Sequence, residues 1–293
     1  MRKFWAIFLC LALLAGLCAC GEVVQHGPPA PPEITDTSDT MTQELTVMSF
    51  NVYTRNMGGR KNGVLRTILR ESPDSVGLQE AHGRWRVFLR RELCGKTYGI
   101  GIEYAMACAK GRYAGIGEGV PILYRSDKYD LLEEGVFWLS ETPRRASLGW
   151  DATIRPRVAG YAVLRDRNTG FTYVHFNAHF DNRGEIARVN SARMIADRIN
   201  EMGLPAVFTG DINAGPDELP AQYLEAGGLT DLRFYAAETD TGATLPDWDA
   251  VLDYVYANHF LRGAKEFKVI RDEYDGMYPS DHFAVAATLT LAN

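Results

Sequence analysis

Short apolar runs alternate with amphipathic segments from Leu45 to the end of the chain, and this alternation limits the possible folds more than any other feature. The apolar runs have the length of strands. The clearest amphipathic segment, 185–202, repeats apolar residues at helical spacing along one stripe. Strands with helices between them predict one layered α/β (α+β) domain over residues 45–292. Strands are expected at 45–53, 74–80, 120–125, 135–139, 161–165, 173–179, 206–209, 251–256 and 283–291, and helices at 60–71, 83–94, 185–202 and 219–226.

The N-terminal segment differs from the rest of the chain. Two basic residues precede an uncharged apolar run that ends in Leu-Cys-Ala-Cys20, which is typical of an export signal with a bacterial lipobox. We therefore expect residues 1–20 to be a lipoprotein signal peptide and Cys20 to carry a lipid that anchors the protein to the membrane, in the periplasm or at the cell surface. An uncleaved anchor helix is the alternative, because the run is only just short of a bilayer span. The Pro-, Thr- and Ser-rich residues 21–44 predict a flexible linker.

Cys94 and Cys108 are the only cysteines after the N-terminal segment, and 14 positions separate them. In an oxidising compartment, such a pair favours one disulfide that closes a small loop. The chain-entropy model assigns such a loop about 3 kcal/mol of stability. Two unpaired buried thiols are the alternative.

The formal net charge of −6 bears on the class of partner. An acidic surface argues against tight nonspecific binding of nucleic acid, which usually needs a basic face. No Lys/Arg-rich stretch with interleaved aromatic residues is present to follow a single strand. A nuclease stays possible, because a local basic groove or a bridging cation can offset a negative average.

Several expected strands end in a carboxylate, an amide or an imidazole. One such residue is explained by turn chemistry or helix capping, but six strand ends that a sheet can align at one edge indicate a site. Oxygen ligands without a cysteine cluster suit a hard divalent cation, namely Mg²⁺, with Mn²⁺ or Ca²⁺ as alternatives. The missing HExxH and Cys/His motifs argue against zinc. The residues are Asn51, Glu80, His179 with Asp181, Asp211 with Asn213, Asp253, and Asp281 with His282.

Four of these segments, in this order, resemble the endonuclease/exonuclease/phosphatase superfamily: Ser49-Phe50-Asn51, Leu78-Gln79-Glu80, Gly210-Asp211-Ile212-Asn213 and Ser280-Asp281-His282. The resemblance covers nearly the whole domain, and further segments look like a bacterial branch of the family. It implies a four-layer sandwich, in which two mixed β-sheets pack face to face with helices on their outer faces. It places the site at one rim of that sandwich.

The resemblance also implies a cation site and the group that activates water. Glu80 and Asn51 would be metal ligands, and Asp281 a third contributor. Asp211 would accept the proton of the attacking water, and Asn213 would hold a phosphoryl oxygen or the water.

Two histidine–carboxylate pairs are expected to face the phosphate. His282, as an imidazolium paired with Asp253, would stabilise the transition state. His179 with Glu118 would form a second pair. Arg157 is expected to contact a phosphate oxygen.

The resemblance does not choose a substrate, because family members cleave DNA, RNA tails, inositol phosphates and sphingomyelin. Tyr53 stands where some nucleases of the family carry an acidic residue, and Ala178 where Thr is common. We expect a monomeric exported hydrolase of small phosphoesters. An extracellular nuclease is the second hypothesis, and a surface lipoprotein that binds a phosphorylated or glycan ligand without turnover is the third.

Overall fold

The structure is a computed structural model that describes residues 43–81, 83–98, 101–108, 119–261 and 263–291. All of them belong to one compact unit. The expected signal peptide, Cys20 and nearly all of the linker lie outside the described residues, as does Glu118. Among the helices of the described residues, none has the length and apolarity that crossing a membrane requires.

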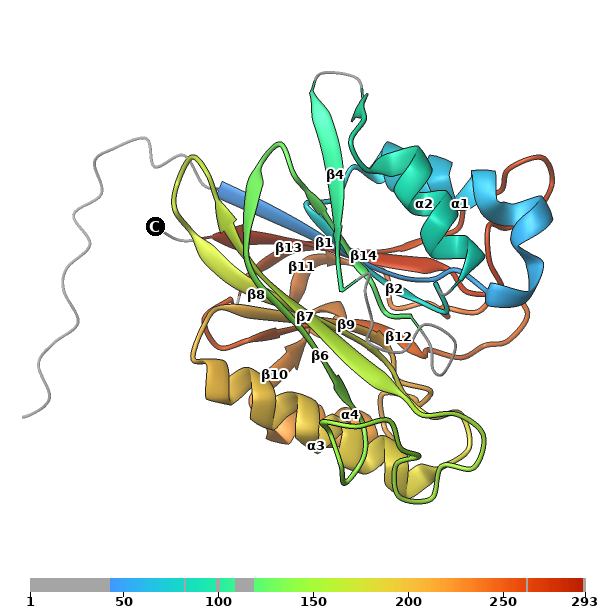
Figure 1. The fold of residues 1–293 in the computed structure, drawn as a ribbon, viewed down its shortest axis with the longest axis vertical. Helices are drawn as coiled ribbons and strands as arrows, with labels where there is room; N and C mark the ends of the chain where they lie inside the picture. Colours follow the sequence, from blue (N-terminus) through green and yellow to red (C-terminus); the bar gives the residue numbers. More distant parts are fainter. Residues whose placement is uncertain (1–42, 82, 99–100, 109–118, 262, 292–293) are drawn as a thin grey trace, which may run out of the picture. The chain divides into compact units, whose positions relative to one another are not determined.

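Two mixed β-sheets pack face to face, and helices cover their outer faces, which confirms the predicted sandwich (Figure 1). The first sheet has eight strands in the order β11-β13-β14-β1-β2-β5-β4-β3, and β1 and β2 run parallel. The second has six strands in the order β10-β12-β9-β8-β7-β6, and β8 and β9 run parallel. The bounds in the first sheet are β1 Gln43–Asn51, β2 Ser75–Gln79, β3 Thr97–Tyr98, β4 Ile102–Ala107, β5 Ile122–Arg125, β11 Ala236–Thr239, β13 Ala264–Ile270 and β14 Ala284–Leu291. Those in the second are β6 Tyr129–Trp138, β7 Val158–Asp166, β8 Thr172–His179, β9 Ala206–Asp211, β10 Leu229–Asp231 and β12 Asp253–Asn258.

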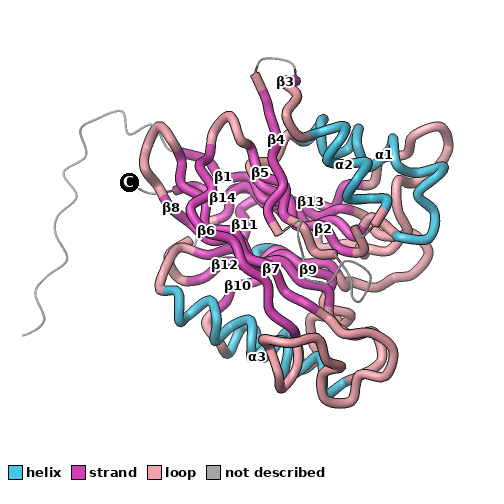
Figure 2. The backbone as a smooth tube through the Cα atoms, in the orientation of Figure 1, coloured by secondary structure: helices cyan, strands magenta, loops and turns pink. Residues whose placement is uncertain are grey.

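The helices lie outside the strands on both sides (Figure 2). Helices α1 (Met57–Glu71) and α2 (Arg84–Leu93) pack on the first sheet, and α3 (Glu185–Met202) and α4 (Leu219–Ala226) pack on the second. A 3₁₀ turn, η1 (Thr54–Asn56), precedes α1, and a short helix, α5 (Leu232–Tyr235), follows β10. The long helix α3 ends at Gly203, whose left-handed backbone (φ 61°) suits glycine at a helix C-terminus.

Strand β1 illustrates how side-chain alternation builds the layers. Leu45 and Val47 lie in the apolar layer between the two sheets. Met48 and Phe50 point the other way, into the layer beneath α1 and α2. All four side chains are at most 1% exposed, and burial of each contributes about 1.5–3 kcal/mol. A strand buried on both faces is rich in apolar residues at successive positions, as in Leu45–Phe50, which is why β1 could be predicted.

A polar layer replaces the apolar one toward the rim of the sandwich and links the two sheets. His175 of β8 contacts Ser75 Oγ through Nδ1 and Thr209 Oγ1 through Nε2, both at 2.8 Å. Gln79 Nε2 donates to Asn177 Oδ1 at 2.8 Å, again from one sheet to the other. Burial lowers the pKa of His175 to about 3, so the ring is neutral. These bonds fix the position of one sheet against the other.

The approach of the sheets in this polar layer requires glycine at position 77 of β2. A Cβ atom at Gly77 would lie 1.9 Å from Thr209 Oγ1 and 2.6 Å from Asn177 Oδ1. No side chain larger than hydrogen fits between two such polar groups without displacing a strand.

The predicted disulfide between Cys94 and Cys108 is wrong, because both cysteines are free. Cys94 pairs with Tyr104 in an isolated bridge, whereas Cys108 follows the far end of β4. Four residues of strand put about 13 Å between these positions, well beyond the Cα separation of a disulfide. Cys108 Sγ donates instead to the carbonyl of Tyr161 at 3.2 Å, and burial raises the pKa of its thiol to about 12.

Candidate active site

The polar strand ends noted in the sequence meet at one rim of the sandwich. In the first sheet, the parallel strands β1 and β2 end there, with Asn51 opposite Gln79 and Glu80 directly after β2. In the second sheet, β8 and β9 end side by side with His179 opposite Asp211, and the antiparallel β12 begins there with Asp253 opposite Asp211. Both sheets thus contribute groups to this rim.

A pocket of about 620 Å³ opens at this rim. The strand-end residues that line it are Glu80, His179, Asp181, Asp211, Asn213, Asp281 and His282. Asn51 and Asp253 lie behind its wall and are at most 1% exposed. The pocket volume falls in the range of small-molecule sites.

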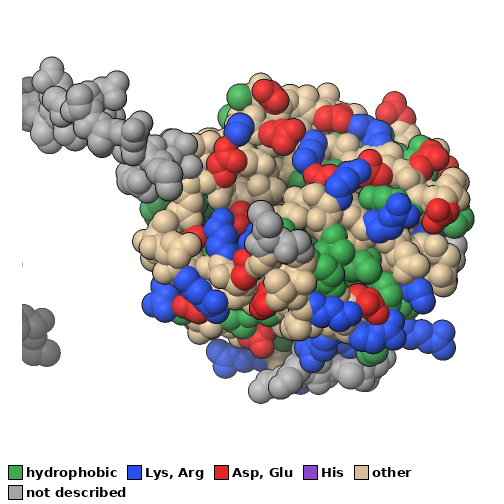
Figure 3. Space-filling model, turned by 90° about the horizontal axis from the view of Figure 1, so that it is seen from above, with side chains coloured by type: hydrophobic (Ala, Val, Ile, Leu, Met, Phe, Trp, Pro, Cys, Tyr) green, Lys and Arg blue, Asp and Glu red, His purple; other side chains and the backbone are tan. Residues whose placement is uncertain are grey.

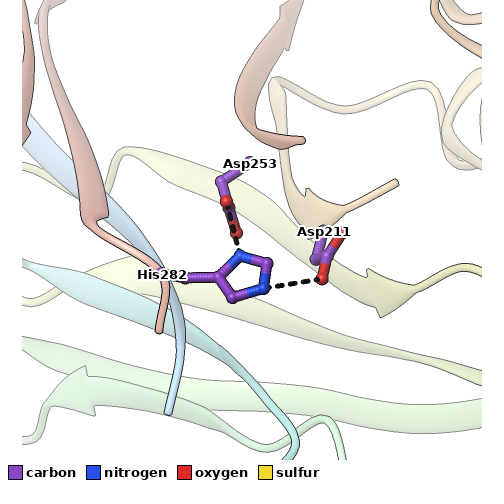
Figure 4. Close-up of side chains that lie close together, drawn as sticks. All are labelled: Asp211, Asp253 and His282. Atoms are coloured by element: carbon purple, nitrogen blue, oxygen red, sulfur yellow. Dashed lines mark hydrogen bonds and ion pairs between the residues drawn. The ribbon is translucent and has the colours of Figure 1, made fainter. Parts of the chain in front are cut away.

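His282, Asp253 and Asp211 form the centre of the site (Figure 4). His282 Nδ1 lies 2.8 Å from Asp253 Oδ2, and Nε2 lies 3.8 Å from Asp211 Oδ2. Burial opposes charge on the ring, but Asp253, with Asp211 and Asp281, outweighs it and raises the pKa of His282 to about 10. The ring is therefore an imidazolium at neutral pH. Ligand atoms of Asp211, Asp253 and His282 also lie within 4.8 Å of one another, so these residues form a possible metal-binding triad.

Asp211 is held from several directions. Asn51 Nδ2 donates to Oδ2 at 3.0 Å, and His179 Nε2 lies 3.3 Å from the same oxygen. The backbone N–H of Asn213 donates to Oδ1 at 3.0 Å. The carboxylate is only 1% exposed, and these contacts fix its orientation.

Glu80 and Asp281 form an acidic pair on the wall of the pocket that the first sheet provides. Glu80 has a left-handed backbone (φ 57°), and the N–H of Thr54 donates to its Oε2 at 2.8 Å. Burial raises the pKa of Asp281, and the negative charge of Glu80 adds to this rise. Two carboxylates that repel each other in a half-buried pocket are the chemistry of a hard-cation site.

The structure places the expected metal ligands and the expected histidine pair differently with respect to the pocket. Of the three expected metal ligands, Glu80 and Asp281 line the pocket, whereas Asn51 points its amide nitrogen at Asp211. The expected partner of His179, Glu118, lies outside the described residues, and among those described His179 faces Asp211.

Basic and apolar side chains from loops complete the pocket. Arg157 is 6% exposed, and its Nε lies 3.8 Å from Asp181 Oδ2. The lining also includes Arg55, Ile154, Arg155, Arg183 and Trp248, which do not stand at predicted strand ends. Arg55 lies in the short turn η1 and the others lie in loops, so no periodic pattern distinguished them from ordinary surface residues. Guanidinium groups beside an acidic pair can bind an anion next to a cation.

Comparison with known proteins gives one family match and several similar solved structures. Residues 48–282 match the family described as Endonuclease/Exonuclease/phosphatase. An endonuclease/exonuclease/phosphatase family protein of Bacteroides thetaiotaomicron is 28% identical with a TM-score of 0.76, covering 86% of this chain and 99% of that chain. The mannosyl-6-phosphatase of the same organism is 28% identical with a TM-score of 0.75, covering 84% and 99%. A protein of Bacteroides vulgatus from the same family is 26% identical with a TM-score of 0.75, covering 86% and 100%. No protein with a curated description matches the chain.

Proposed function

Because the chain belongs to the endonuclease/exonuclease/phosphatase family, we propose that it is a divalent-metal-dependent phosphoesterase that releases phosphate from phosphorylated sugars. The observation that carries this proposal is the meeting of Glu80 and Asp281 with Asp211 and His282 around one pocket. The 28% identity with the mannosyl-6-phosphatase of Bacteroides thetaiotaomicron supports a sugar phosphate as the substrate.

Glu80 and Asp281, with Asn51 as a further oxygen ligand, would hold the cation. Burial, to which the negative charge of Glu80 adds, raises the pKa of Asp281, and a bound divalent cation offsets both costs of the charged carboxylate. The triad around His282 is the weaker cation site, because Asp253 occupies Nδ1 and an imidazolium cannot ligate a metal. When bound, Mg²⁺ would neutralise negative charge on the phosphoryl group, and Mn²⁺ or Ca²⁺ could take its place.

Asp211 would accept the proton of the attacking water. Contacts from Asn51, His179 and the Asn213 backbone orient its carboxylate toward one position in the pocket. As the water oxygen bonds to phosphorus, the ester P–O bond breaks, and the released sugar oxygen takes up a proton from solvent. The side-chain amide of Asn213 donates one hydrogen to Phe180 O at 3.1 Å, which leaves its second hydrogen for a phosphoryl oxygen or the water.

His282 would stabilise the charge that develops on the phosphoryl oxygens. Asp253 holds Nδ1, so the N–H of Nε2 is the donor on the pocket side of the ring. Arg157, with the loop arginines of the pocket, would bind the remaining phosphate charge. A phosphomonoester carries more negative charge than a diester, so a pocket with several guanidinium groups favours the monoester.

A nuclease of the same fold and a binding protein without turnover are the alternatives. Acidic and basic side chains are interspersed over much of the face seen in Figure 3, which does not favour a polyanion on that face. A protein that only binds its ligand has no need to orient Asp211 or to keep His282 charged.

A substrate panel tests the proposal. The purified chain is incubated with Mg²⁺ and with mannose 6-phosphate, glycerol phosphate, bis-p-nitrophenyl phosphate or an oligodeoxynucleotide. We expect phosphate release from the monoesters that EDTA abolishes and added Mg²⁺ restores, and none from an Asp211→Asn variant. Faster cleavage of the oligodeoxynucleotide would favour the nuclease, and no EDTA-sensitive turnover of any substrate would favour the binding protein.

The location of the enzyme is a separate proposal that rests on the N-terminal sequence. Residues 1–20 would direct export, Cys20 would carry the lipid, and residues 21–44 would link it to the catalytic domain at 45–292. Labelling with a fatty-acid analogue in bacteria tests this. Incorporation should disappear in a Cys20→Ala variant, and label retained in that variant would exclude Cys20 as the attachment site.

A further inference from the structure

Trp248 is an exposed tryptophan in the wall of the catalytic pocket. It is 71% exposed, yet it lines the same pocket as Asp211 and His282. A large apolar ring in contact with water at the edge of a pocket gains free energy when a ligand covers it. None of the groups assigned to hydrolysis needs this side chain, so it is available for recognition of the substrate.

The loop that carries Trp248 is anchored to the catalytic strands by Thr244, which is fully buried. Thr244 N–H donates to the carbonyl of Ala250 at 2.8 Å, which closes the turn around Trp248. Thr244 Oγ1 accepts from the N–H of Asp253 at 3.3 Å, and its carbonyl accepts from the N–H of Phe283 at 2.6 Å. Asp253 is itself a member of the His–Asp pair and Phe283 directly follows His282, so the backbone of this loop is held next to that pair.

A second apolar surface comes from the loop between β6 and β7. Ile154 is 50% exposed and lines the pocket. Its loop is tied to α3 by Asp151, whose carboxylate accepts from the N–H of Ala187 at 2.7 Å and of Ile186 at 3.1 Å. A pocket of about 620 Å³ is much larger than a phosphate group, so it has room for the organic part of the ester beside these surfaces.

The charged residues next to Trp248 in the sequence indicate which kind of ligand ring would pack against it. Asp247 and Asp249 flank it in the sequence, and both are exposed. Two carboxylates repel the further phosphates of a nucleic acid strand, but they accept hydrogen bonds from hydroxyl groups. An exposed aromatic side chain with a carboxylate on each sequence neighbour therefore fits a neutral ring that carries hydroxyls better than it fits a polyanion.

We propose that Trp248 determines the substrate specificity of this enzyme, by packing its indole against the sugar ring of a hexose phosphate whose phosphate lies at Asp211 and His282. This inference rests on the proposed function. Trp248 contributes to binding of the sugar and takes no part in the proton transfers. Its loss therefore changes the preference of the enzyme for a sugar phosphate over other phosphoesters.

Steady-state kinetics of Trp248→Ala and Trp248→Phe test the proposal, with mannose 6-phosphate and the acyclic glycerol phosphate as substrates. Trp248→Ala should raise KM for mannose 6-phosphate more than it changes kcat. It should lower the ratio of kcat/KM for mannose 6-phosphate over glycerol phosphate about 5- to 10-fold, the usual value of one aromatic contact. Trp248→Phe should keep most of the ratio. The matched control is Phe260→Ala, an exposed aromatic residue outside the pocket, which should leave the ratio unchanged.

An unchanged ratio in Trp248→Ala would overturn the proposal, as would a larger loss of activity on a 5′-mononucleotide, which would indicate base stacking. Calorimetric titration with mannose 6-phosphate separates this inference from the proposed function, because it needs no turnover. Asp211→Asn should bind the sugar phosphate, and Asp211→Asn with Trp248→Ala should bind it about 5- to 10-fold more weakly. Equal binding by the two variants, or no binding by either, would overturn the role of Trp248. The absence of turnover by the wild type would instead overturn the proposed function.

Discussion

The neutral histidine between the two sheets predicts a specific loss of stability in acid. His175 is fully buried, and its two ring nitrogens contact Ser75 and Thr209 at 2.8 Å. Burial lowers the pKa of the ring to about 3 in the folded protein. In the unfolded chain the same ring has a pKa of about 6.5. As the pH falls below that value, the unfolded chain takes up a proton that the folded protein does not, so the free energy of unfolding decreases.

The size of this effect follows from the two pKa values. The stability from His175 is fully present above pH 6.5 and is lost as the pH falls toward 3. The loss is about 1.4 kcal/mol for each pH unit within this range, because the difference in bound protons is close to one. Of the range from pH 7.5 to pH 5.0, about 1.5 pH units lie below 6.5. Over these units His175 alone lowers the free energy of unfolding by about 2 kcal/mol.

Urea denaturation at the two pH values measures this loss. Other groups titrate in the same range, so the wild type is compared with His175→Gln, which keeps a donor and an acceptor without the titrating ring. The decrease in unfolding free energy from pH 7.5 to pH 5.0 should be about 2 kcal/mol larger in the wild type than in the variant. Equal decreases in both proteins would show that His175 is protonated in the folded state, and the account of the polar layer would fail.

Three further predictions concern the site and the contact between the sheets. Asp253→Asn should lower kcat about 1,000-fold with little change in the thermal midpoint, because His282 loses the carboxylate that keeps it charged; a loss below 10-fold would exclude this role. Glu80→Gln should raise the Mg²⁺ concentration for half-maximal activity about 10- to 100-fold, and an unchanged metal titration would exclude Glu80 as a ligand. Gly77→Ala should lower the unfolding free energy by about 3 kcal/mol, because its methyl group overlaps Thr209; a thermal midpoint equal to that of the wild type would contradict the close approach of the sheets.

Most central strands and the long helices could be predicted from the sequence, since their signal is local. Strand β1 has four apolar residues between Leu45 and Phe50, and α3 repeats apolar residues on one stripe. Strands β4 and β13 were not predicted. In β13, Lys265, Glu266 and Lys268 break the apolar pattern, and β4 is a short segment of six residues that only its pairing with β5 identifies as a strand.

The separation of Cys94 from Cys108 and the contact between His179 and Asp211 were beyond prediction for another reason. Spacing along the chain does not report distance in space, and β4 separates Cys94 from Cys108 although only 14 positions lie between them. His179 contacts Asp211 because β8 and β9 are parallel neighbours, a pairing that the sequence between them does not reveal.

The sequence by itself determined which functional groups stand at the strand ends. The type of side chain at a strand end is a local property, and it does not depend on how the sheets are arranged. Asn51, Glu80, Asp211 and His282 could therefore be named as candidate site residues without coordinates. Only the tertiary structure decided which of these groups contact one another, and that Trp248 lies beside them. These relations depend on the packing of one sheet against the other and on anchored loops, and both arise from contacts between residues far apart in the chain.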